Sequence, residues 1–144
     1  MRSFALKFTT SYDPQDLDIE RVIEWLSNDA YWAIGRDSET IKASFINSVP
    51  ISVRGEGGEF LGIGRLVTDG YTFGWLCDVY VHPDYRGLGI GHAITRAATS
   101  YFNNSPKFRL ILKTRDAHRV YKECGFLELS SPENWLGIEE GFQV

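Results

Sequence analysis

The chain has 144 residues, of which 43% are hydrophobic and 14% aromatic, and its formal net charge is −4. This length and composition predict one globular domain, residues 1–144, that buries a core without disulfides. The acidic balance disfavours a general nucleic-acid binder, which needs a basic face. No run of about 18 apolar residues occurs, so no membrane span is expected.

The two cysteines, Cys77 and Cys124, match no metal-ligand spacing and no disulfide framework. They are expected to be buried structural thiols, and no metal site is predicted. The N-terminal segment returns to charge at Lys7, too soon for a secretory signal. A reduced, cytoplasmic location is therefore the expectation.

The first part of the chain predicts a strand and two helices. Residues 4–9 read as the strand, and apolar residues recur at helical spacing from Ile19 to Leu26. An aromatic loop over 28–37 leads to a second helix, which starts at Asp37 or Ser38 and ends near Ser48. The pattern predicts that Ile46 faces inward on this second helix.

The rest of the chain alternates strands and helices. Glycine-containing turns join three strands, at 51–54, 59–68 and 72–81. A helix follows whose apolar stripe runs from Ile90 to Tyr101. Strand 108–114, helix 116–124 and strand 126–129 complete the pattern. The order predicts an α+β sandwich around a mixed sheet, with antiparallel hairpins first and a βαβ crossover later.

A glycine-rich segment joins strand 72–81 to the next helix. The first N–H groups of a helix have no intrahelical partner, and the helix dipole favours negative charge there. Gly87, Gly89 and Gly91 keep side chains off this backbone, and Arg86 adds a cation at its mouth. The spacing fits neither the dinucleotide fingerprint nor a P-loop, and an ordinary strand-to-helix turn is the alternative.

A second segment, residues 114–126, strengthens the interpretation as a ligand site. It follows the next strand and carries Tyr121, Gly125 and Phe126 in the order Tyr-x-x-x-Gly-Phe, with Ala117 four residues before the tyrosine. With the Arg-x-x-Gly-x-Gly run at 86–91, this order and spacing resembles motifs A and B of the GNAT acetyltransferases, over roughly residues 51–129.

The resemblance implies a fold and a cofactor. The fold is a three-layer sandwich around a mixed, mostly antiparallel sheet, with a V-shaped splay between its two central strands. The co-substrate is acetyl-CoA, with its pyrophosphate on the glycine loop and its pantetheine arm on the preceding strand. The coenzyme contacts implied are Val79, Tyr80, Val81, Arg86, Gly87, Leu88, Gly89, Ile90, Gly91, His92, Thr114, Ala117 and Tyr121. Thr114 stands where many members of the family carry asparagine, and a threonine hydroxyl replaces only part of that contact.

Two residues are candidates for catalysis. Tyr121 matches the tyrosine that protonates the departing thiolate in many members of the family; the alternative is a tyrosine that packs its ring in the core. Asp78 is the best candidate for general base, on the same face of its strand as Tyr80. Its alternative is a carboxylate paired to a neighbouring cation. His82 and His118 titrate in the right range but lie at the ends of elements.

The acceptor side is less defined by sequence. Tyr31, Trp32 and Arg36 are the candidate substrate-binding residues, because the region between the first two helices borders the acceptor site in the family. The alternative for Trp32 is packing against the sheet. Nearby acids (Asp29, Asp37, Glu39) would suit a cationic amine, and Trp135 is another aromatic candidate.

The expected function is acetyl-CoA-dependent transfer of an acetyl group to a primary amine, on a small molecule or a peptide. Two alternatives stay open. One is a non-catalytic acyl-CoA-binding or regulatory module, and the other is a nucleotide-binding domain, which the lack of a Gly-Lys-Ser/Thr element disfavours. A homodimer is possible on general grounds.

Overall fold

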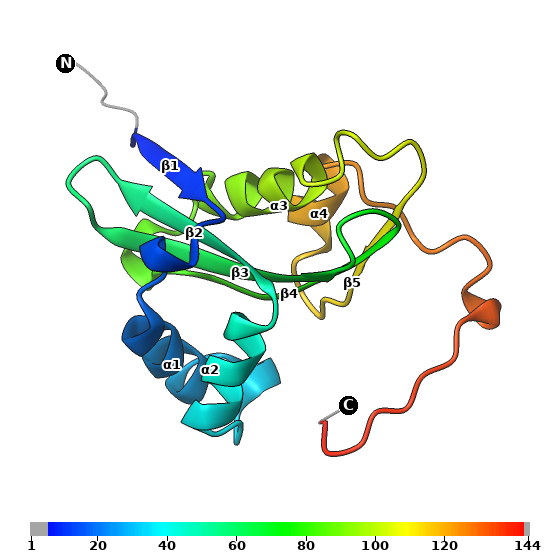
Figure 1. Cartoon of the computed structure of the whole chain (residues 1–144), viewed down its shortest axis with the longest axis horizontal. Coiled ribbons are helices and arrows are strands. Elements are labelled where there is room, and N and C mark those ends of the chain that lie inside the picture. Colours follow the sequence, from blue (N-terminus) through cyan, green and yellow to red (C-terminus); the bar gives the residue numbers. More distant parts are fainter. Residues whose placement is uncertain (1–5, 143–144) are drawn as a thin grey trace.

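A computed structural model describes residues 6–142 and shows one five-stranded sheet in the order β1-β2-β3-β4-β5 (Figure 1). The strands are β1 (Phe8–Ser11), β2 (Val49–Gly55), β3 (Phe60–Thr68), β4 (Phe73–Val81) and β5 (Arg109–Leu112). The first three pairings are antiparallel and the β4–β5 pairing is parallel. The predicted mixed, mostly antiparallel sheet is confirmed.

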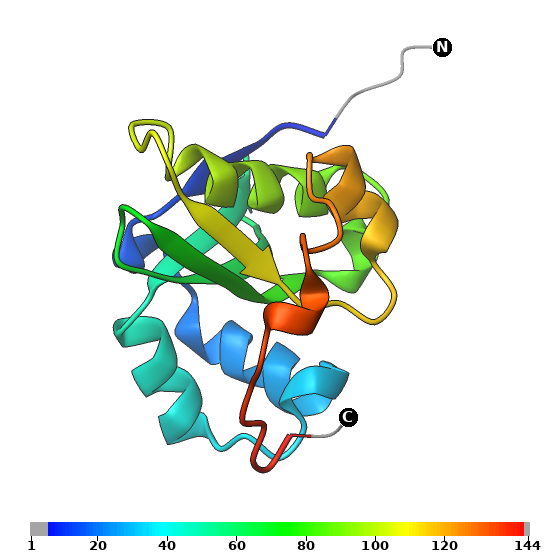
Figure 2. The same cartoon turned by 90° about the vertical axis from the view of Figure 1, so that its right-hand side faces the viewer.

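Helices cover both faces of this sheet (Figures 1 and 2). They are α1 (Ile19–Asn28), α2 (Ser38–Ile46), α3 (Ile90–Ser100) and α4 (His118–Glu123), with short 3₁₀ turns η1 (Pro14–Asp16), η2 (Tyr31–Ala33), η3 (Pro83–Tyr85) and η4 (Pro132–Asn134). Asp18 and Asp37 cap α1 and α2 by accepting backbone N–H groups at 3.1 and 2.7 Å. One buried cluster packs α1 and α2 against the sheet, and a second packs α3 against the opposite face. The predicted three-layer sandwich is confirmed.

A β-bulge interrupts β4 at Asp78. Arg65 pairs with Cys77 and Ile63 pairs with Tyr80, so two residues of β4 stand opposite Gly64 alone. Asp78 has φ 51°, a left-handed conformation that aspartate tolerates better than most residues. Beyond the bulge, Tyr80 lies in the cluster beneath α1, and Asp78 bonds to residues of the same layer. The prediction that these two share a face is confirmed.

The sheet also opens beside β4. Pairing between β4 and β5 joins residues 73–76 to residues 109–112, whereas β4 continues to Val81. Among the described residues, no strand pairs with this side of β4 beyond Leu76. The expected splay is present, and it leads towards the start of α3 (Figure 1).

Some sequence predictions fail at element ends. The strand predicted at 126–129 is wrong: these residues have no regular structure, and Leu127 is 83% exposed. Figure 2 shows the chain after α4 running along the outside of the molecule. Ile46 is 81% exposed rather than inward, because it is the last residue of α2, and Tyr101 lies on the surface after the last turn of α3. Residues 4 and 5 of the first predicted strand lie outside the described residues.

Candidate active site

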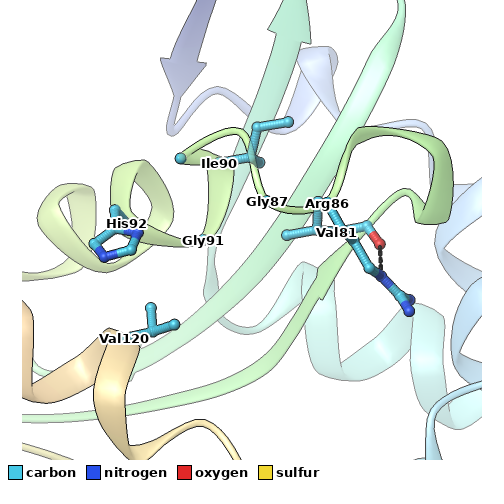
Figure 3. A pocket seen from close by; sticks show the side chains of 8 residues that line it. Val81, Arg86, Gly87, Ile90, Gly91, His92 and Val120 are labelled. Carbon is cyan, nitrogen blue, oxygen red and sulfur yellow. Dashed lines mark hydrogen bonds between the residues drawn. The ribbon is translucent and has the colours of Figure 1, made fainter.

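The N-terminus of α3 opens into a pocket. Gly89 caps the helix with φ 91° and no capping side chain, a conformation that favours glycine. The first helical hydrogen bond runs from Ala93 N to Gly89 O, so the backbone N–H groups before Ala93 have no intrahelical acceptor. The pocket has a volume of about 290 Å³ and is lined by Val81, Arg86, Gly87, Gly89, Ile90, Gly91, His92 and Val120 (Figure 3). A helix N-terminus facing an open pocket is suited to an anionic group.

Arg86 lines this pocket, but its charge is directed elsewhere. Its Nε donates to the carbonyl of Val81 at 3.1 Å, and its guanidinium lies 5.1 Å from the Tyr80 ring centroid. Its Nη2 is 3.5 Å from the carboxylate of Asp29, which also accepts a short hydrogen bond from the Tyr80 hydroxyl. Figure 3 shows the side chain directed away from His92. These contacts tie the loop to β4, and the contact of Arg86 with the coenzyme stays a prediction.

Residues of α4 form the opposite wall. Val120 of α4 lies close to His92 and Gly91 of α3 (Figure 3), and His92 Nε2 is 2.6 Å from Glu123 Oε2. Glu123 also accepts from Arg119 Nε at 2.8 Å, and these two hydrogen bonds lower the pKa of its carboxyl. Sequence reasoning missed Val120 and Glu123, since neither belongs to a motif.

Tyr121 follows Val120 on α4. Burial raises the pKa of its hydroxyl to about 12, with further contributions from Tyr31, Asp116 and Cys124. The ring packs on the α3 side of the sheet and meets the Phe126 ring edge-on at 6.0 Å. The hydroxyl is therefore protonated at neutral pH, the state that a proton donor needs.

The loop before α4 is held by its own side chains. Thr114 Oγ1 accepts from Ala117 N at 3.1 Å, which braces the turn into the helix. Both residues were predicted to contact the coenzyme, and that role stays a prediction. Leu88, another predicted contact, is exposed on the glycine loop.

Asp78 lies on the face of β4 that α1 and α2 cover. It is 3% exposed and accepts three hydrogen bonds there. Trp32 Nε1 donates to Oδ1 at 3.0 Å, and Arg36 Nη1 and Arg65 Nε each donate to Oδ2 at 2.8 Å. This geometry matches the alternative interpretation of Asp78 from the sequence, a carboxylate paired to neighbouring cations. The role of Asp78 as general base stays an untested prediction.

The predicted acceptor residues lie beside this cluster. Tyr31 and Trp32 form η2, with their rings edge-on at 5.0 Å. Arg115, in the loop before α4, stacks with its Cζ 3.7 Å from the Tyr31 ring centroid. The structure thus brings Tyr31, Trp32 and Arg36 together at the splay, while Trp32 also packs against the core beneath α1. Sequence reasoning missed Arg65 and Arg115.

The remaining candidate residues from the sequence make ordinary structural contacts or lie apart from the Asp78 cluster. His82 Nδ1 accepts from Asp84 N at 3.1 Å and so caps η3, and His118 begins α4. Trp135 lies over Arg109 at 5.9 Å. Cys77 and Cys124 are free and partly buried, and burial raises the pKa of Cys77 to about 11.

The sequence model of the Acetyltransferase (GNAT) family matches residues 17–126 of this chain. A Gibberella zeae protein, named provisionally as an acetyltransferase, is 26% identical over 91% of this chain and 85% of its own length. A solved GNAT-family protein from Xanthomonas campestris pv. campestris is also 26% identical, with a TM-score of 0.87 over 94% of this chain and 95% of that one. Rv2747 from Mycobacterium tuberculosis, solved in complex with CoA and NLQ, shares the fold at 19% identity, with a TM-score of 0.69 over 85% of this chain and 73% of that one.

The sheet with helices on both faces, and the pocket at the N-terminus of α3, match the sandwich of these acetyltransferases. The chain belongs to the GNAT acetyltransferase family. In residues 6–142, no helix is long and apolar enough to cross a membrane.

Proposed function

We propose that this chain is an acetyl-CoA-dependent N-acetyltransferase that transfers the acetyl group directly to a primary amine. The observation that carries this proposal is the unpaired side of β4 beyond Leu76, which leads to the open N-terminus of α3. An extended ligand with amide groups at one end and phosphates at the other matches both features.

The residues of the pocket fit such a ligand. A Cβ atom added at Gly87 or Gly89 would meet no other atom within 4 Å, so the backbone of the loop is open on its outer side. The backbone N–H groups of residues 87–92, in the loop and at the start of α3, would hold the pyrophosphate. The backbone of Val79, Tyr80 and Val81 would pair with the pantetheine arm as an added strand.

The chemistry uses residues at the splay. When bound, acetyl-CoA supplies a thioester carbonyl for attack by an amine. The new C–N bond forms as the C–S bond breaks, and the amine proton leaves to solvent or to a base that we do not assign. A backbone N–H near Val79 would polarise the carbonyl, and Tyr121 would donate a proton to the departing sulfur.

Thiol release from acetyl-CoA, measured across a panel of amines, tests the proposal. We expect turnover of at least one amine and loss of about 10²-fold or more in kcat for Tyr121→Phe. The matched control is Tyr71→Phe, because Tyr71 is exposed in the β3–β4 turn. Calorimetry with CoA tests binding separately. If CoA binds and no amine gives turnover above buffer, the chain is a non-catalytic CoA-binding module and the enzyme proposal is wrong.

A further inference from the structure

The cluster around Asp78 carries more positive than negative charge. Two guanidinium groups, those of Arg36 and Arg65, share one carboxylate, which leaves a net charge of +1 in this group of three. The side chains of both arginines are mostly buried, at 18% and 16% exposed. An uncompensated charge is costly where water is partly excluded, unless an anion completes the group.

Arg36 has guanidinium N–H groups that make no hydrogen bond within the described chain. Its Nη1 bonds to Asp78, and no hydrogen bond within residues 6–142 occupies its Nε or Nη2. These two atoms are also not fully buried. Within residues 6–142, the fully buried side-chain nitrogen or oxygen atom that lacks a hydrogen-bond partner is Ser52 Oγ, not an atom of Arg36. Arg65 uses two of its three nitrogen atoms, Nε on Asp78 and Nη1 on Ser48 Oγ, whereas Arg36 uses one. Arg36 therefore presents part of its guanidinium to open space.

The position of Arg36 relates it to the acceptor. It follows η2, whose Trp32 shares the Asp78 carboxylate and whose Tyr31 contributes to the raised pKa of Tyr121. Arg115, which is exposed, adds a second cation to this region and stacks on the Tyr31 ring. Arg36 and Arg115 thus lie beside η2, next to the proposed proton donor, and Asp116 is the carboxylate that also acts on the Tyr121 hydroxyl.

The acids that seemed to favour a cationic acceptor are engaged elsewhere. Asp29 accepts from the Tyr80 hydroxyl and faces Arg86. Asp37 caps α2, and Glu39 is exposed and 3.7 Å from Lys42. None of these carboxylates contacts the cluster around Asp78.

We propose that the acceptor amine carries a carboxylate and that Arg36 binds it, with Arg115 as a second cation. The substrate class is then an amino acid or a molecule with an amino-acid-like end. The planar guanidinium fork matches a carboxylate with two parallel hydrogen bonds. This inference rests on the proposed acetyltransferase function and narrows its acceptor.

The experiment compares amines that differ only in a carboxylate, such as phenylalanine with phenethylamine, lysine with cadaverine, and tyrosine with tyramine. We expect kcat/KM to be about 10- to 100-fold higher for the carboxylated member of the pairs that are turned over, mainly through KM. Arg36→Gln should bring this ratio close to one and leave the affinity for CoA unchanged. Arg36→Lys should retain part of the preference, because it keeps the charge and loses the fork.

A second variant protects the test against misfolding. Arg115 does not touch Asp78, so Arg115→Gln should fold normally and lower the carboxylate preference by a smaller factor. Arg21→Gln, on the exposed side of α1, is the matched control and should leave the preference intact. Equal or better turnover of the decarboxylated amines would overturn the inference while the acetyltransferase proposal stands.

Binding of products separates the two proposals further. Calorimetry compares N-acetylphenylalanine with N-acetylphenethylamine, and this readout needs no turnover. Binding of the carboxylated product that is lost in Arg36→Gln would support the inference even if catalysis were absent. Equal binding of both products, or binding unaffected by Arg36→Gln, would refute it.

Discussion

Replacing Asp78 with alanine should destabilise the protein more than any single exposed substitution. The change removes the acceptor of three hydrogen bonds and leaves two mostly buried guanidinium groups without a counter-charge. Breaking a buried pair in this way costs about 3–5 kcal/mol of unfolding free energy. Alanine at the left-handed φ of 51° adds a cost of about 1 kcal/mol relative to aspartate.

Thermal and urea unfolding followed by circular dichroism measure this effect. For a chain of this size, a loss of 3–5 kcal/mol lowers Tm by roughly 6–20 °C. Asp78→Asn should lie between wild type and Asp78→Ala, because the amide oxygen still accepts and asparagine tolerates the left-handed backbone. Asp84→Ala is the control, since Asp84 is exposed, and it should change stability by about 0.5 kcal/mol or less.

The cluster predicts an asymmetry that tests the charge argument directly. Arg36→Gln leaves Asp78 paired with Arg65 as a neutral pair, whereas Asp78→Ala leaves two unpaired cations. Arg36→Gln should therefore cost less than Asp78→Ala. An Asp78→Ala protein within about 1 kcal/mol of wild type, or less affected than Arg36→Gln, would refute the reasoning.

Three further predictions concern the site and the tail. Since Tyr121 has a pKa of about 12, the pH profile of kcat should have no descending limb below about pH 10, and a fall near pH 8 would remove Tyr121 as the proton donor. Gly89→Ala should cost about 1 kcal/mol of stability and weaken CoA binding, whereas Gly58→Ala, at a similar φ in the hairpin, should cost the same without affecting CoA; equal CoA affinities in calorimetry would contradict the placement of the pyrophosphate. Deleting residues 130–144 should lower stability by about 1 kcal/mol or less in urea unfolding, because the polar contacts of its described part, residues 130–142, with the preceding chain are an exposed ion pair and one cation–π contact; a loss of cooperative folding would contradict this.

The cofactor side of the site could be predicted from sequence because it is encoded locally. Gly87, Gly89 and Tyr121 occupy short motifs whose spacing fixes their position on a strand-to-helix turn and a helix. The structure places Gly87 and Gly89 in the pocket, and Tyr121 follows the pocket residue Val120 on α4. Their contacts with the coenzyme stay predictions. The contact of Arg86 with Asp29 could not be predicted, because the two residues are 57 positions apart in the sequence.

The acceptor side could not be predicted in the same way. Asp78 meets Arg65 and Arg36 at separations of 13 and 42 residues, and no local pattern records such pairings. The register shift at Gly64 also depends on two strands rather than one. The strand predicted at 126–129 is wrong as well: its apolar residues Leu127 and Leu129 stay exposed, and β-propensity mainly reflects packing against strand neighbours that this segment lacks.

The open side of β4 has a consequence for the lifetime of the protein. An unpaired strand edge invites pairing with any other extended chain, and natural proteins usually block such edges. If the co-substrate pairs with this edge, it blocks that route as long as it is bound, and mass action adds about 2.7 kcal/mol of stability at 100 times its Kd. The protein should then aggregate fastest when the coenzyme is scarce, so that the supply of coenzyme governs how long the folded protein persists.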